Sequence, residues 1–154
     1  MAKKKTTKEH VISNRRARHD YELEDSLIVG LQLSGAETKA LRMGHGHLRG
    51  AYVTVKENEL WLINATIAGS SGIYIADSET TRARKLLAKK REIKELIATK
   101  KQGRTIVPLE ILNRGRFIKL RIAVGKGRKL YDKRQLLKKR DEERRISASL
   151  KNQD

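Results

Sequence analysis

Short runs of alternating apolar and polar residues recur through the central part of the chain. Apolar side chains occupy every second position of residues 27–33, which is the period of a strand with one buried face. Residues 52–55 and 60–67 are rich in β-branched and aromatic side chains and flank a short polar turn, so they predict a hairpin. Residues 105–112 and 116–124 flank a turn that contains glycine, and they predict a second hairpin.

Helix signals lie between these strands. Ser34 and Glu37 have the spacing of a capping box, which predicts a short helix through about Arg42. Residues 82–102 carry leucine and isoleucine at helical spacings before a glycine, so they predict one long or two short helices. Residues 68–81 are typical of a long loop, to which we assign no function.

These elements predict a chain that is mainly β with peripheral helices. Several short strands with interspersed helices fit a small antiparallel barrel better than a parallel sheet, which needs regular alternation of strands and helices. Pro108 indicates that one strand lies at an edge or carries a bulge. We therefore expect an OB-like antiparallel β-barrel over residues 14–127, preceded by a flexible basic segment over residues 1–13.

The C-terminal segment, residues 128–154, has few apolar residues and many charges. We expect a basic tail that is disordered when it is free. Asp141 and Arg145 form an acid-first i, i+4 pair, and Ile146 and Leu150 share one helical face. The tail can therefore become helical when it is bound.

The net charge of the chain indicates what kind of partner it binds. The chain has 154 residues, which fits one domain, and its 36 Lys and Arg residues against 18 Asp and Glu residues give a net charge of +18. The charge is +3 over residues 1–13, +10 over residues 14–127 and +5 over residues 128–154. A multiply charged anion is the natural partner.

The sequence also limits the compartment and the chemistry. It contains no cysteine, which excludes disulfides, thiolate chemistry and Cys-ligated metal sites and fits a reducing compartment. No apolar run has the length of a signal-peptide core or of the ~20 residues that span a bilayer. We therefore expect a cytoplasmic protein.

Two basic segments of the predicted barrel suit nucleic acid. Residues 14–21 join three guanidiniums to an imidazole and a phenol, which can bond to phosphates and stack on bases. A solvated basic lead-in to the first strand is the alternative, and the pattern gives the two equal weight. On the last strand Phe117, Lys119 and Arg121 share one face, which is an RNA platform or, equally on pattern alone, an ordinary solvent-exposed face.

Residues 125–134 combine two glycines with five cations around Tyr131 and lead out of the predicted barrel. This composition indicates a hinge followed by a segment that grips RNA, and a generic basic tail is the competing interpretation. The pair Gly125-Lys126 is not part of a P-loop, because position 120 is Leu120 where that pattern requires glycine.

Two clusters resemble parts of a metal or catalytic site. His45 and His47 lie two residues apart without an evident third ligand, so we expect a loop that contacts backbone or phosphate, with no metal and no cofactor. Glu22 and Glu24 form an acidic patch at a strand start that no other feature completes into an active site. We interpret these carboxylates as solubilising charges, and a nuclease that uses either cluster is an alternative.

Five segments, in order along the chain, closely resemble the SsrA-binding protein (SmpB) family. They are NRRARHDY at residues 14–21, GLQLSG at 30–35 running into KALR at 39–42, WLINA at 61–65, RKLL at 84–87 and GRKLYDKR at 127–134. The resemblance implies an OB-type barrel and an RNA-binding adaptor without catalysis. It implies that the chain binds the tRNA-like domain of transfer-messenger RNA (tmRNA, or SsrA RNA) and delivers it to stalled ribosomes for trans-translation.

The resemblance also implies site residues. The family's RNA-facing residues correspond to Asn14, Arg15, Arg18, His19 and Lys119, and we add Arg121 and Lys126 to this surface. The family's tail motif, which works near the decoding centre of the small ribosomal subunit, corresponds to Tyr131, Asp132, Lys133 and Arg134, and we add Arg128 and Lys129. One departure is Ile28, which stands where the family commonly carries a glutamate, so any RNA contact through that carboxylate is absent here.

We therefore expect a monomer whose partners are tmRNA, the small ribosomal subunit and its ribosomal RNA, with no membrane partner. The main rival is a ribosomal or other structured-RNA-binding protein with a similar barrel. Composition alone does not separate the two.

Overall fold

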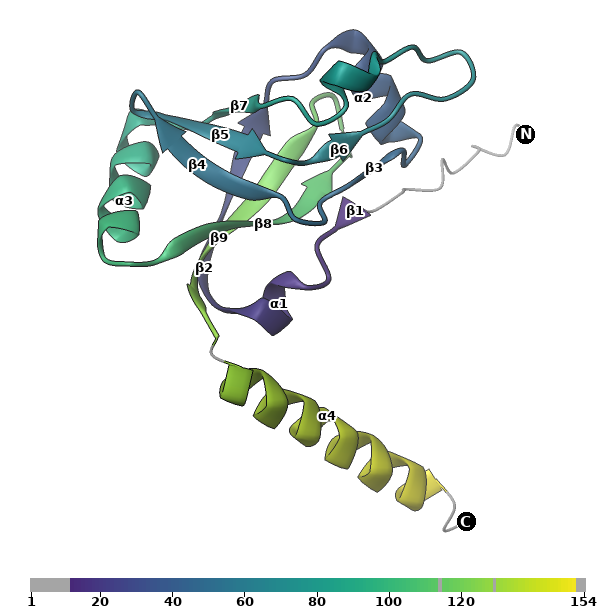
Figure 1. Cartoon of the computed structure of the whole chain (residues 1–154), viewed down its shortest axis with the longest axis vertical. Helices are drawn as coiled ribbons and strands as arrows, with labels where there is room; N and C mark the ends of the chain where they lie inside the picture. The colour runs from purple at the N-terminus through teal and green to yellow at the C-terminus, as the bar shows by residue number, and fades with distance from the viewer. Residues whose placement is uncertain (1–11, 114, 129, 152–154) are drawn as a thin grey trace, which may run out of the picture.

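The computed structural model describes residues 12–113, 115–128 and 130–151, and for residues 130–132, 150 and 151 it describes the backbone only. The strands are β1 (Ile12–Ser13), β2 (Tyr21–Leu31), β3 (Gly46–His47), β4 (Tyr52–Lys56), β5 (Glu59–Ile63), β6 (Thr66–Ile67), β7 (Arg84–Leu87), β8 (Thr105–Leu112) and β9 (Lys119–Gly127). The helices are α1 (Ala17–Asp20), α2 (Gly35–Arg42), the 3-10 helix η1 (Asp77–Glu79), α3 (Lys90–Lys101) and α4 (Leu130–Lys151). Figure 1 shows the strands gathered in one body from which α4 extends away.

The larger sheet is antiparallel, with the strand order β1-β8-β4-β5-β7-β2-β9. Because β9 also pairs with β8, the strands from β8 to β9 form a closed ring, and β1 adds to β8 outside it. β3 and β6 form a separate two-stranded sheet. The expectation of a mainly β chain with peripheral helices is confirmed, and the buried aliphatic side chains of the ring strands form the core.

Both predicted hairpins are present. β4 and β5 pair from Tyr52 with Ile63 to Lys56 with Glu59. The strand predicted over residues 60–67 ends early, because Asn64 has a φ of 63° and turns the chain toward β6. β8 has the predicted bounds, and its register against β9 shifts just after Pro108, as expected for a bulge.

The capping box of α2 is also confirmed. Ser34 Oγ accepts a hydrogen bond from the Glu37 backbone N–H at 3.2 Å, and the Ser34 backbone N–H donates to Glu37 Oε1 at 3.0 Å. Ala40 and Leu41 on the inner face of this helix are fully buried. The predicted loop of residues 68–81 contains η1 and packs Ile73 against the core.

One helix prediction is wrong in part, because residues 84–87 are strand β7 and α3 begins only at Lys90. Leu86 pairs with Leu60 of β5 and with Leu31 of β2, and it is 1% exposed. β7 therefore supplies the strand that joins β5 to β2 in the ring. This tertiary pairing outweighs the helical spacing of the leucine and isoleucine residues.

A buried charge network holds β7 against α2. Arg84 is fully buried, its Nε lies 2.5 Å from Glu37 Oε2, and its Nη1 donates to Ala65 O at 2.8 Å. Burial acts to raise the pKa of Glu37, but hydrogen bonds from Arg82, the Ser34 N–H and Arg84 together hold it below its ordinary value. Burial lowers the pKa of Arg84. The network ties the start of β7 to the first turn of α2.

The tail is helical in the structure, where the sequence predicts a free tail without regular structure. α4 spans 22 residues, and among its described side chains only Lys133 and Leu136 are half-buried while the others are exposed. Helical order agrees with the acid-first pair found in the sequence, but a helix with so little packing is marginally stable in water.

Candidate nucleic-acid interface

The basic lead-in, residues 14–21, is hydrogen-bonded to β8 through Asn14. The backbone N–H of Asn14 donates to Leu109 O at 2.7 Å, and its side-chain Nδ2 donates to Pro108 O at 3.0 Å. Arg15 and Arg18 are exposed beside this anchor. Asn14 thus has a positioning role that the sequence does not reveal, since it holds the neighbouring guanidiniums at a fixed place on the surface.

A cleft of about 270 Å³ brings four of the predicted RNA-binding residues together. Asn14, Arg15 and Arg18 line it from the lead-in, and Arg121 lines it from β9. Glu110 lies across the sheet from Arg121, and its Oε1 is 2.8 Å from Arg121 Nη1. This ion pair orients the guanidinium and offsets part of the positive charge of the cleft.

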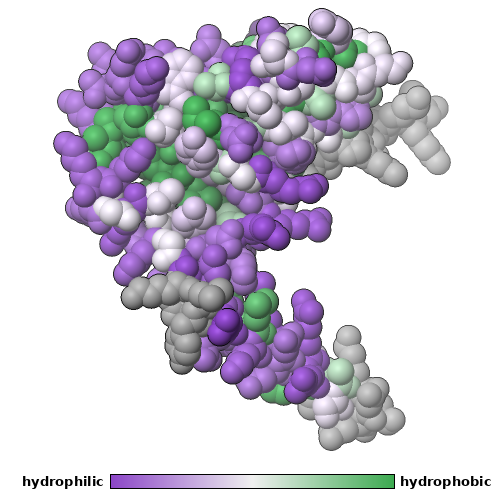
Figure 2. Space-filling view, in the orientation of Figure 1, coloured by the Kyte–Doolittle hydropathy of each residue, from purple (hydrophilic) through white to green (hydrophobic). Residues whose placement is uncertain are grey.

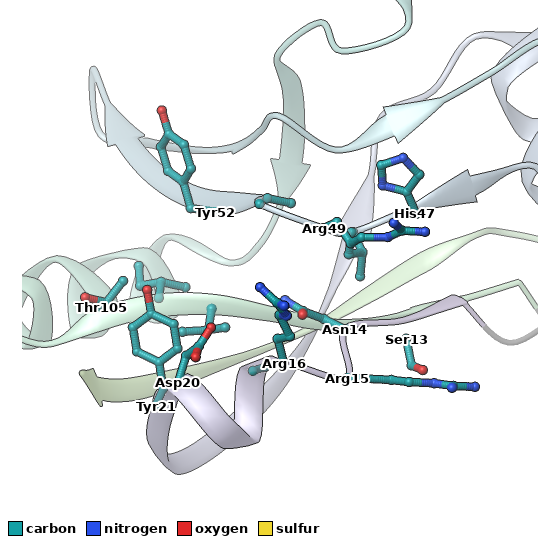
Figure 3. A pocket seen from close by; sticks show the side chains of 16 residues that line it. Ser13, Asn14, Arg15, Arg16, Asp20, Tyr21, His47, Arg49, Tyr52 and Thr105 are labelled. Atoms are coloured by element: carbon teal, nitrogen blue, oxygen red, sulfur yellow. The ribbon is translucent and has the colours of Figure 1, made fainter. Parts of the chain in front are cut away.

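A larger groove of about 1080 Å³ also opens beside the lead-in (Figure 3). Arg16 lines it from the position before α1, and Tyr21 lines it from the start of β2. Arg49 lines it from the segment that enters β4, and Tyr52 from the first position of β4. Guanidiniums and phenol rings around one concave surface can bond to phosphates and stack on unpaired bases. Asp20 places one carboxylate in the same groove.

Sequence reasoning missed part of this groove. Arg49 and Tyr52 line it but were not among the predicted binding residues. The sequence signal of these residues is weak, because 27 residues separate the lead-in from Arg49 and 30 separate it from Tyr52, so only the fold brings them together. His47 also lines it, from the loop that the sequence expects to contact backbone or phosphate. His19, which was predicted, is half-buried in α1 and lines neither this groove nor the smaller cleft.

The outer face of β9 carries Lys119 and Arg121, as the alternation predicts. The apolar residues at alternate positions of 118–124 are buried on the other face. Ile28 of β2 pairs with Arg121 and is 47% exposed, so this chain has an apolar side chain beside the cations at that position. Lys119 pairs with Gly30 and lines neither the cleft nor the groove. The structure thus joins Arg121 to the lead-in and leaves Lys119 apart.

A third cleft, of about 720 Å³, lies where β9 leads into α4. Lys126, Arg128 and Lys139 line it together with Glu22, which pairs with Lys126 across the sheet. The predicted RNA contact through Lys126 therefore lies at the junction between the body and the tail.

Asp20 contacts the tail directly. Its backbone carbonyl accepts from the Arg128 N–H at 2.9 Å, and its Oδ1 lies 3.2 Å from Lys133 Nζ. Arg134 is exposed, and Figure 2 shows mostly hydrophilic residues along α4. Lys129 and the side chains of Tyr131 and Asp132 lie outside the described residues.

Both carboxylates of the acidic cluster have a cation as their neighbour. Glu24 forms an ion pair with Arg104, and Glu22 faces Lys126. In the parts of the chain that the structure describes, no three His, Cys, Asp or Glu side chains converge as a metal site would require. No helix within those parts is long and apolar enough to cross a membrane.

The fold and these surfaces define a class: a small, basic, mainly β protein with arginine- and tyrosine-lined clefts around its N-terminal lead-in. The comparison with protein families gives the particular family. The model for SmpB protein matches residues 11–152, and the chain belongs to the SmpB protein family.

Individual relatives agree with this assignment. The chain is 40% identical over 155 aligned positions to the SsrA-binding protein of Trichormus variabilis, with 99% of each chain covered. It is 46% identical over 145 positions to the SsrA-binding protein of Protochlamydia amoebophila, with 93% of this chain and 94% of the relative covered. A solved structure described as "tmRNA-SmpB: a journey to the center of the bacterial ribosome" contains a similar chain at 34% identity and a TM-score of 0.67, covering 83% of this chain and 94% of that one.

Proposed function

We propose that the chain is an RNA-binding adaptor that binds the tRNA-like domain of tmRNA and delivers it to stalled ribosomes for trans-translation. The observation that carries this proposal is the match to SsrA-binding proteins over nearly the whole length, together with the fold shared with a chain studied with tmRNA and the bacterial ribosome. The adaptor makes and breaks no bond, and it acts as a cytoplasmic monomer.

The body of the adaptor is an OB-like barrel. The closed order of antiparallel strands supports this assignment, because an OB-fold is a small antiparallel barrel. Such a barrel leaves its outer faces and connecting loops free for ligands. The lead-in crosses the outside of β8 and lines both of the clefts beside it. We assign the RNA contact to the lead-in with Arg15, Arg18, His19, Arg121, Lys119 and Lys126, and we add Arg16, Arg49 and the two tyrosines of the larger groove.

The tail is the part that enters the ribosome. It is disordered when free and helical when a phosphate-rich surface covers it, which the sparse packing of α4 supports. Tyr131, Asp132, Lys133 and Arg134 then lie near the decoding centre. Asp20 holds Lys133 in the present arrangement, so tail binding on the ribosome replaces this carboxylate with phosphate at Lys133.

The test is a gel-shift and pull-down experiment with RNA sequencing. The full chain should shift a tRNA-like tmRNA fragment and recover tmRNA as its main bound transcript. Arg15→Glu should weaken the shift, and Lys94→Glu on the exposed side of α3 should not. Recovery of ribosomal RNA alone supports a general structured-RNA-binding protein, and cleavage of the RNA during prolonged incubation with divalent metal supports a nuclease.

A further inference from the structure

The turn between β8 and β9 presents an aromatic ring to solvent. Phe117 is 69% exposed, whereas the next residue, Ile118, is 5% exposed and packs in the core. The guanidinium carbon of Arg116 lies 5.7 Å from the centroid of the Phe117 ring. A single exposed apolar residue needs no explanation, so the case for function rests on what surrounds the ring.

Hydrogen bonds hold this turn against the C-terminal end of α2. Arg42, at the end of α2, donates from its guanidinium to the carbonyls of Asn113 at 3.4 Å, Gly115 at 3.1 Å and Arg116 at 3.0 Å. Asn113 Nδ2 in turn donates to Leu41 O at 3.1 Å. These bonds fix the backbone that carries the ring, so little conformational entropy is lost when a ligand stacks on it.

The charges beside the ring are available to an anion. Lys119, the first residue of β9, follows Phe117 by two residues, and both side chains are exposed while Ile118 between them is buried. Among the described residues, no carboxylate forms an ion pair with Arg116 or Lys119, whereas Arg121 on the same strand pairs with Glu110. The ring therefore stands between two cations that no described carboxylate pairs with.

We infer that this turn is a second RNA contact, which binds one unpaired base by stacking on Phe117 and the flanking phosphates by Arg116 and Lys119. An aromatic ring between unpaired cations has the composition of a base-stacking site, in which the ring accepts any base and the cations follow the backbone. A protein partner would favour further apolar side chains around the ring over two free charges.

This inference rests on the proposed function and adds a geometric requirement to it. Lys119 and Lys126 stand at opposite ends of β9, seven residues apart, which corresponds to roughly 24 Å at about 3.4 Å per residue. One RNA must extend over that length to reach both the turn and the tail junction. A folded RNA that offers an unpaired loop base away from its helix meets this requirement.

The test compares variants of the full chain in titrations with a tRNA-like RNA. Phe117→Ala and Phe117→Leu should each weaken binding about 5- to 100-fold, the range expected for loss of one stacked base, and Phe117→Trp should bind at least as well as the parent. Tyr74→Ala is the matched control, because Tyr74 is 86% exposed on the 68–81 loop, and it should bind as the parent does.

A second readout separates stacking from a structural effect. The emission added by Phe117→Trp, relative to the parent with Trp61 alone, should be quenched when RNA binds. If the parent binds the RNA and Phe117→Leu binds equally well, or the added emission is not quenched, this inference is overturned while the proposed function stands. If the parent itself does not bind tRNA-like RNA, the proposed function fails.

Discussion

Glu37 should be the most sensitive charged residue for the stability of the fold. Glu37→Gln removes the charge but keeps an oxygen that can accept from the Ser34 N–H, so the helix cap is kept while the amide NH2 replaces the oxygen that accepts from Arg84 Nε. Loss of one partner from a buried pair costs about 3–5 kcal/mol, because the other charge stays buried. Arg84 keeps carbonyl acceptors at Ala65 and Thr80, which favours the lower end of that range.

Urea unfolding followed by circular dichroism gives the free energy of unfolding for the parent and the variant. We expect a loss of about 3 kcal/mol, which for a chain of this size lowers the melting temperature by roughly 6–12 °C. Glu59→Gln is the matched control, because Glu59 pairs with Lys85 at 2.9 Å but is 41% exposed, so it should change stability by under about 1 kcal/mol. Equal losses in the two variants refute the reasoning.

The same pair predicts a pH dependence. The pKa of Glu37 is lower in the folded chain than its ordinary value of 4.5. The carboxylate therefore contributes stability that is fully present above pH 4.5 and is lost as the pH falls through the folded-state pKa. The stability difference between the parent and Glu37→Gln should be constant near neutral pH and shrink in acid. A difference that grows in acid contradicts the assigned direction.

Further predictions concern RNA binding. The logarithm of the affinity should fall linearly with the logarithm of salt concentration, by about 0.7–0.9 for each phosphate that is neutralised. Lys119→Glu should weaken binding and shift stability by under about 0.5 kcal/mol, because the side chain is exposed. Glu110→Gln releases Arg121 from its carboxylate, so it should raise affinity and steepen the salt dependence by about one phosphate's share. Truncation after Gly127 should preserve the unfolding transition and most binding to isolated tRNA-like RNA while abolishing peptide tagging on stalled ribosomes.

Each of these has a result that counts against it. A salt slope near zero would show that the RNA is not held through phosphate contacts. Unchanged binding of Lys119→Glu at several salt concentrations would show that the RNA does not contact the start of β9. If Glu110→Gln leaves both affinity and slope unchanged, Arg121 does not contact the RNA. If the truncated chain tags as fast as the full chain at saturating RNA, the tail serves only as a solubilising extension.

The strands with clear local signals were predictable. β8 was placed correctly because an apolar run rich in β-branched residues, a proline and a glycine-containing turn all occur within residues 105–115. β7 was missed because Leu86, Ile93 and Ile97 also fit a helix. The deciding facts are the pairing of Leu86 with Leu60 and the burial of Arg84 against a carboxylate 47 positions earlier, and neither is visible in a local window.

The binding surface was predictable in part for the same reason. The lead-in is one continuous segment, so its arginines could be identified from the sequence. Arg49 and Tyr52 join it only through the groove. The pairing of Glu110 with Arg121 depends on a register shift inside β8, and no spacing rule along one strand reveals it.

Net charge alone does not locate a binding surface, but ion pairing divides the described arginines into those with and those without a carboxylate partner. Between residues 12 and 128, the described arginines that pair with a carboxylate are Arg82, Arg84, Arg91, Arg104 and Arg121. The described arginines without such a partner are Arg15, Arg16, Arg18, Arg42, Arg49, Arg116 and Arg128, and they lie at the lead-in, the groove, the β8–β9 turn and the tail junction. We propose that the second group marks the surface that an RNA contacts, because a guanidinium binds phosphate best when no carboxylate competes for it. Arg42 is the exception in this group, since its guanidinium already donates to carbonyls of the β8–β9 turn.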